Sequence, residues 1–217
     1  MTLIKRASTA LSTLAMAGAV VGLSAAPAMA STNLTVKISN GGTYTATASK
    51  TVLTDNGVSV TCTSTSTTHA STASGKIPTA TKTAASPVKI GTAAKLAFHN
   101  CSGPLGAVTT HVQALPYTVS VDSKTNSSGQ TDGIISGTKV QVSMTGCSFT
   151  VTGSAPEFYT NKTHKLSVTN KLPITPLNKA QLTVSNVTGC ANLVNNGDHP
   201  TFVSTYTVSR HFTIKST

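Results

Sequence analysis

The sequence predicts an all-β fold, an antiparallel β-sandwich or barrel-like domain, on the basis of three observations. After residue 30 the chain contains 37 Thr and 23 Ser among 187 residues. Thr favours strands, whereas Ser and Thr compete with the backbone for hydrogen bonds inside helices. Apolar residues alternate with polar ones, and no window shows a sustained apolar stripe of helical spacing. Turn signals separate the alternating segments at the intervals that an all-β domain requires.

The first thirty residues have the layout of a secretory signal peptide. Lys5 and Arg6 precede an uncharged stretch rich in Ala, Leu and Val at 10–23, and the segment closes on Ala28-Met29-Ala30, an A-x-A cleavage site. A helix-breaking Pro27 follows the apolar stretch, which makes a retained membrane span the weaker alternative. We therefore predict a signal peptide at 1–30 and a mature all-β region at 31–217 that is secreted or associated with the cell wall.

The alternating segments predict seven half-buried antiparallel strands. Their inward-facing residues are Leu34/Val36/Ile38, Val58/Val60/Cys62, Tyr117/Val119/Val121, Val140/Val142/Met144, Phe149/Val151, Leu182/Val184 and Tyr206/Val208. The turns predicted between them are Asn40-Gly41-Gly42, Asp55-Asn56-Gly57, Ser102-Gly103-Pro104, Ser128-Gly129, Asp132-Gly133 and Asn195-Asn196-Gly197-Asp198.

The segment 62–95 differs in composition, because it consists mostly of Ser, Thr, Ala and Lys with few large apolar side chains. So little apolar surface does not offset the entropy of ordering the chain. We therefore predict a solvated excursion held at both ends by cysteines. A pair of edge strands is one alternative, and a flexible, basic, glycan-accepting stalk is another.

Internal sequence similarity predicts a diverged two-fold repeat with halves at 31–122 and 123–217. The tetrapeptide Tyr-Thr-Val-Ser begins sixteen residues after Cys101 and again sixteen residues after Cys190. The preceding cysteines, Cys62 and Cys147, are each followed by Thr at the third and fifth positions. The alternative is that two unrelated strands share a tetrapeptide that favours β structure.

Four cysteines in an exported chain allow three disulfide connectivities, and the cysteines alone do not choose among them. The repeat favours pairing within each half, Cys62 with Cys101 and Cys147 with Cys190. Each bond would then close a loop of about 40 residues and contribute about 3 to 4 kcal/mol in the loop-entropy model. A zinc site is the competing interpretation, but the chain has no C-x-x-C spacing, and export favours oxidation.

Three stretches combine cysteines with turn residues: Phe98-His99-Asn100-Cys101-Ser102-Gly103-Pro104-Leu105-Gly106, Thr145-Gly146-Cys147, and Thr188-Gly189-Cys190 leading to Asn196-Gly197-Asp198 and Tyr206-Thr207-Val208. These motifs resemble those of a group of uncharacterised small secreted proteins of actinobacteria that are rich in β structure and have four cysteines. The resemblance spans most of the mature chain. It implies secretion and a β-rich fold, and it implies no catalytic residue and no ligand.

The acidic residues give little support to catalysis. There are only five of them, and Asp55, Asp132 and Asp198 lie in Gly/Asn turn contexts, where Asp caps a turn. Asp198 beside His199 could suggest a catalytic triad, but the motif G-x-S-x-G is absent, and adjacent residues of a strand face opposite ways. The six histidines lack metal-ligand spacing. We predict a protein that is not an enzyme, with no catalytic residue, metal or cofactor.

Charge supplies the main functional indication. Removal of Lys5 and Arg6 leaves 14 basic and 5 acidic residues, a net charge of +9. We predict a non-catalytic protein of the medium or cell envelope that associates with an anionic cell-wall polymer. The alternative is a binding module, or a carrier or pore with an apolar cavity for a small ligand or lipid. Nucleic acid is not an expected partner, because the basic residues are mostly Lys and are spread along the chain without aromatic neighbours.

Overall fold

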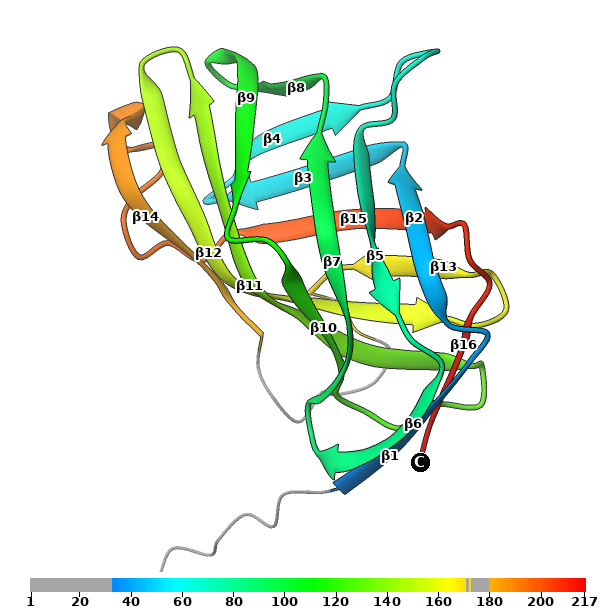
Figure 1. Ribbon diagram of the computed structural model, residues 1–217. Helices are drawn as coiled ribbons and strands as arrows, with labels where there is room; N and C mark the ends of the chain where they lie inside the picture. The colour runs from blue at the N-terminus through cyan, green and yellow to red at the C-terminus, as the bar shows by residue number, and fades with distance from the viewer. Residues whose placement is uncertain (1–32, 171, 173–179) are drawn as a thin grey trace, which may run out of the picture. The chain divides into compact units, whose positions relative to one another are not determined.

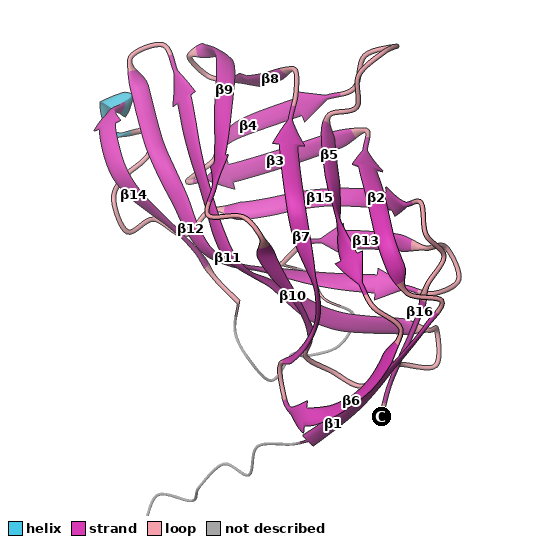
Figure 2. Ribbon diagram, in the orientation of Figure 1, coloured by secondary structure: helices cyan, strands magenta, loops and turns pink. Residues whose placement is uncertain are grey.

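A computed structural model describes residues 33–170, 172 and 180–217, and this part of the chain is nearly all β (Figures 1 and 2). The predicted signal peptide at 1–30 lies outside the described residues and stays a prediction. In the described part, no helix is long and apolar enough to cross a membrane. One short 3₁₀ turn, η1 (Cys190–Asn192), interrupts the strands.

The strands are β1 (Asn33–Ser39), β2 (Gly42–Ala48), β3 (Lys50–Asp55), β4 (Val58–Thr63), β5 (Ser71–Ile77), β6 (Ala80–Ala85), β7 (Val88–Phe98), β8 (Cys101–Gly103), β9 (Gly106–Gln113), β10 (Tyr117–Val121), β11 (Gln130–Met144), β12 (Cys147–Thr160), β13 (Lys165–Val168), β14 (Leu182–Gly189), β15 (Thr201–Val208) and β16 (Thr213–Ser216). Each of the seven predicted alternating segments lies on one of these strands.

The large sheet closes on itself. In order, β2, β5, β7, β10, β11, β12, β13 and β15 each pair with the next, and β15 pairs back to β2, so eight antiparallel strands form a ring. A second path through β3, β4, β8 and β9 also connects β15 to β11. The predicted antiparallel, barrel-like all-β fold is therefore confirmed.

Two groups of strands form opposite walls. In Figure 1, β2, β5 and β7 run upright in front of β13, β15, β3 and β4, which run across behind them. The strands β11 and β15 belong to both paths. Gly133–Ser136 of β11 pair with β10, whereas Lys139–Ser143 pair with β9. A separate three-stranded sheet, in the order β16-β1-β6, covers one end of the molecule.

The alternation that predicted the strands also separates core from surface. In β1 the side chains of Leu34, Val36 and Ile38 are buried and Lys37 is exposed. In β15, Tyr206 and Val208 are buried in the same way. Full burial of each large apolar side chain contributes about 1.5 to 3 kcal/mol, which offsets the entropy of ordering the strands.

The prediction of a solvated excursion at 62–95 is wrong. This segment contains β5, β6 and most of β7, and β5 lies between β2 and β7 inside the ring. Hydrogen bonds along both edges hold β5 in the sheet, while Ile77, Val88 and Ile90 are buried. The edge-strand alternative holds for β6 alone, which lies at the edge of the small sheet.

Two turn predictions have opposite outcomes. Asn56 and Gly57, both with positive φ, connect β3 to β4 as predicted. The predicted turn at Asp132-Gly133 is wrong, because both residues lie inside β11. Gly133 serves close packing instead, since a Cβ there would lie 2.2 Å from the backbone oxygen of Ser120.

The structure contains two disulfides, Cys62–Cys101 and Cys147–Cys190, which is the pairing that the sequence halves favour. The first joins directly opposed residues of β4 and β8. The second joins the first residue of β12 to the residue after β14. The two-fold repeat itself stays a prediction. The predicted halves are not separate in the fold, since β15 of the second half pairs with β2 and β3 of the first.

Candidate functional site

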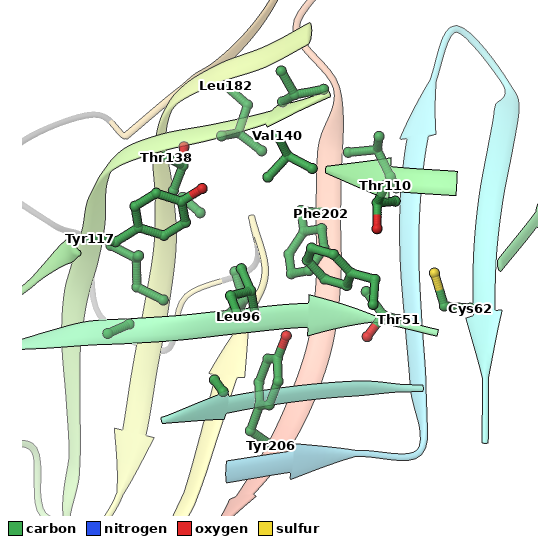
Figure 3. Close-up of a pocket in the computed structure, with 18 of the residues that line it drawn as sticks. Thr51, Cys62, Leu96, Thr110, Tyr117, Thr138, Val140, Leu182, Phe202 and Tyr206 are labelled. Atoms are coloured by element: carbon green, nitrogen blue, oxygen red, sulfur yellow. The ribbon is translucent and has the colours of Figure 1, made fainter. Parts of the chain in front are cut away.

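An apolar cavity of about 120 Å³ lies between the two walls (Figure 3). Strands of both paths line it. Large apolar side chains include Leu96 and Phe98 of β7, Val140 of β11, Leu182 of β14 and Phe202 of β15. In Figure 3 the side chain of Leu96 points from β7 into the space below Val140 and Leu182. The interior of the ring is therefore not completely filled by the protein's own side chains.

Small residues account for the empty space. Ala46 of β2, Ala73 of β5, Ala93 of β7 and Ala155 of β12 all line the cavity. Protein interiors are otherwise close-packed, with few voids larger than a water molecule. A dry cavity of about 150 Å³ lined by Leu, Ile and Phe binds benzene. The cavity found here is close to that size and has the same chemical character.

Two aromatic side chains meet across the cavity. Phe98 of β7 and Phe202 of β15 pack edge to face, with ring centroids 5.8 Å apart and an interplanar angle of 72°. Both side chains are only half-buried. Such a pair contributes about 0.5 to 1.5 kcal/mol beyond the area that it buries. The contact ties the walls together and leaves aromatic surface available to an apolar ligand.

Tyr117 and Tyr206, the tyrosines of the two Tyr-Thr-Val-Ser tetrapeptides, both line this cavity. The Tyr117 hydroxyl donates to the Lys139 carbonyl at 2.7 Å, and the Tyr206 hydroxyl accepts a hydrogen bond from Ser71 Oγ at 2.9 Å. Burial raises the pKa of both phenols. Because the protein already satisfies these hydroxyl groups, the tyrosines add ring surface to the cavity and require no polar ligand.

A buried chain of hydroxyl groups supports Tyr206 at the wall of the cavity, and its member Thr51 lines the cavity. Thr51 Oγ1 lies 3.0 Å from Ser71 Oγ and 3.0 Å from Ser204 Oγ, and all three residues are buried. Thr51 and Ser204 are on neighbouring strands of one wall, and Ser71 is on the other. This chain holds the two walls in register at the edge of the cavity.

The sequence did not show that carboxyl groups come together in the fold. Glu157 on β12 lies opposite Gly133, next to Asp132, and is almost completely buried. Burial raises the pKa of Glu157 well above its ordinary value, and the charge of Asp132 raises it further. Glu157 Oε2 has no hydrogen-bond partner among the described residues. Burial and the neighbouring charge therefore favour the neutral, protonated form of Glu157.

A second pair of carboxyl groups, Asp55 at the end of β3 and Asp198 in the loop before β15, also comes together in the fold. The Asp198 carboxylate accepts hydrogen bonds from the Asn195 backbone N–H at 2.7 Å and from Asn56 Nδ2 at 2.9 Å. Burial raises the pKa of Asp55 to about 6, with further contributions from a hydrogen bond to Asp198 and from its charge. The Asn195 N–H lowers the pKa of Asp198. When the two carboxyl groups together bind one proton, that proton is therefore on Asp55.

The structure gives His199 a backbone partner. Its Nδ1 lies 3.0 Å from the Leu182 carbonyl oxygen, so the ring is directed to β14. Elsewhere, His164 and His211 stack with ring centroids 4.1 Å apart. Among the described residues, no three His, Cys, Asp or Glu side chains form a group that could hold a metal ion.

Comparison with known proteins supplies no relative: no family model, no curated protein and no solved structure matches this chain. Function is therefore inferred from the cavity and from the distribution of charge.

Proposed function

We propose that this protein is a secreted, non-catalytic binding protein that accommodates a small apolar molecule, or the apolar end of a larger one, between its two walls. The apolar cavity of about 120 Å³ carries this proposal. Its lining offers rings and aliphatic groups, while the nearby tyrosine hydroxyls are already hydrogen-bonded within the protein. Two disulfides are the state expected of an exported domain.

The size of the cavity sets the affinity. It has room for about the six carbon atoms of benzene or a short end of an acyl chain. Burial of about five methylene groups at about 0.8 kcal/mol each provides about 4 kcal/mol, which corresponds to a Kd of about 1 mM. A ligand that extends beyond the cavity and covers the half-buried Phe98 and Phe202 would bind more tightly.

Thermal unfolding with benzene tests this proposal. At a Kd of about 1 mM, about 10 mM benzene stabilises the native state by about 1.4 kcal/mol, which raises the Tm of a domain of this size by about 3 to 6 °C. Ala73→Leu fills the cavity and should abolish the shift. Ala107→Leu makes the same change at an exposed position of β9 and should preserve it. An equal shift in wild type and Ala73→Leu, or no shift in wild type, contradicts binding in this cavity.

The distribution of charge favours a second function, association with an anionic cell-wall polymer. Asp55, Asp122, Asp132 and Glu157 are buried, whereas most of the described lysines are exposed. The net charge of +9 expected for the mature chain is therefore displayed at the surface with few acidic groups beside it. Such association requires no pocket and weakens with salt, because exposed charges are screened beyond about 8 Å at physiological ionic strength.

Retention on purified cell walls tests this second function. Binding should be strong at low salt and should fall steeply toward physiological salt. It should also decline when the anionic polymer is extracted from the walls. Retention that persists at high salt, or that does not depend on the polymer, contradicts a charge-based association.

A further inference from the structure

The outer face of the small sheet places two lysines directly opposite each other. Lys37 of β1 pairs with Lys215 of β16, and on its other side Lys37 pairs with Thr81 of β6. All three side chains are exposed. Directly opposed residues of antiparallel strands have Cβ atoms about 5 Å apart, and like charges in this arrangement destabilise the sheet.

Hydroxyl groups surround the two lysines on this face. Along the strands, Ser39 pairs with Thr213 on one side of the lysine row, and Thr35 pairs with Thr83 on the other. Thr35 Oγ1 and Thr83 Oγ1 lie 3.0 Å apart. Successive rows on one face of a sheet are about 7 Å apart. We call this surface, made of Ser39, Thr213, Lys37, Lys215, Thr81, Thr35 and Thr83, the lysine–threonine face.

No acidic side chain balances the lysines within the three strands, since β1, β6 and β16 contain neither Asp nor Glu. The opposite face of the same sheet is apolar and buried, with Leu34, Val36 and Ile214. Asp122 accepts a hydrogen bond from the hydroxyl of Ser86, which follows β6 in the chain. Because Asp122 is fully buried, its carboxylate is not part of the exposed face. The side chains of the lysine–threonine face are therefore cationic or hydroxyl-bearing, and most of them are exposed.

We propose that the lysine–threonine face binds the phosphodiester chain of an anionic cell-wall polymer. The two ammonium groups would contact phosphates, and the threonine hydroxyls on either side would donate hydrogen bonds to phosphate oxygens. An open face with rows about 7 Å apart suits an extended chain, whereas a small anion would need a concave site. This proposal rests on the polymer association described above and assigns it to one surface.

The test compares two double variants that remove the same charge. Lys37→Gln with Lys215→Gln changes the lysine–threonine face. Lys162→Gln with Lys165→Gln changes two exposed lysines at the turn before β13 and at its start. Retention is measured at about 50 mM salt on isolated cell walls and on walls from which the phosphodiester polymer has been extracted. Loss of two lysine contacts should weaken binding about ten- to thirtyfold, and the control pair should change it less than about threefold.

The possible outcomes distinguish an error in the polymer association from an error in its assignment to the lysine–threonine face. If wild type is not retained on intact walls, both the polymer association and the lysine–threonine face are wrong. If wild type is retained but both double variants lose binding equally, the association is real and diffuse, and the assignment to this face is wrong. A stability measurement provides an independent check, because removal of the opposed charges at Lys37 and Lys215 should leave the Tm unchanged or raise it at low salt. A lower Tm would show instead that these lysines support the fold.

Discussion

Filling the cavity should make the ligand-free protein more stable. A cavity of about 120 Å³ corresponds to about 3 kcal/mol at about 24 cal/mol per Å³. Ala73→Leu adds three carbon atoms, which contribute up to about 2.4 kcal/mol when they are buried. Ordering the Leu side chain costs about 0.5 to 1 kcal/mol. The expected net gain is therefore about 1.5 kcal/mol, or about 3 to 6 °C in Tm for a domain of this length.

Urea unfolding of the oxidised protein measures this gain directly. The midpoint should rise for Ala73→Leu while the slope m stays constant, since the surface exposed on unfolding hardly changes. Ala107→Leu at the exposed site should lie within about 0.5 kcal/mol of wild type. Destabilisation of Ala73→Leu by more than about 1 kcal/mol would show overpacking. The space between the walls would then be closed in solution, and the reasoning from the cavity would fail.

Three further predictions concern charge and cross-links. Burial raises the pKa of Glu157, so its stabilising contribution is complete below the ordinary value of 4.5 and is lost as pH rises through the folded-state value. Glu157→Gln should flatten this decline in the free energy of unfolding, and an unchanged pH profile would contradict the raised pKa of Glu157. The raised pKa of Asp55 has the same sign, so Asp55→Asn should remove a loss of stability between pH 3.8 and about 6. Carbon-13 NMR titration should find that the Asp55 carboxyl titrates near pH 6, and a midpoint near 4 would refute the raised pKa of Asp55. Replacement of Cys147 and Cys190 by Ser should cost about 3 to 4 kcal/mol, measured by urea unfolding, and a cost below about 1 kcal/mol would contradict the loop-entropy reasoning.

Alternation predicted the strands that have one buried face, such as β1 with Leu34, Val36 and Ile38. It missed β5 because that strand has small or polar residues at every position except Ile77, and it is held mainly by backbone hydrogen bonds along both edges. The sequence gives no sign of these bonds, since their partners lie on strands that are distant in the chain. Composition therefore predicted the fold class, whereas the position of β5 depended on its neighbours.

The candidate site was less predictable than the strands. Ala46, Ala73 and Ala155 line one cavity only because the registers of three separate strands bring them to it. Glu157 meets Asp132 for a similar reason, because β11 and β12 pair over their whole lengths. Neither arrangement leaves a local motif. The alternative of an apolar cavity was drawn from fold class, and its lining residues required the structure.

Closure of the ring by the last strands has a consequence for how the chain is made. β15 pairs with β2 and with β3, and β16 pairs with one edge of β1. During synthesis from the N-terminus, these early strands remain without their final neighbours until residues 201–216 exist. Pairings of such long sequence separation form slowly, and unpaired strand edges invite association between chains. Nascent chains of this protein therefore need to be kept apart until β15 and β16 have been synthesised.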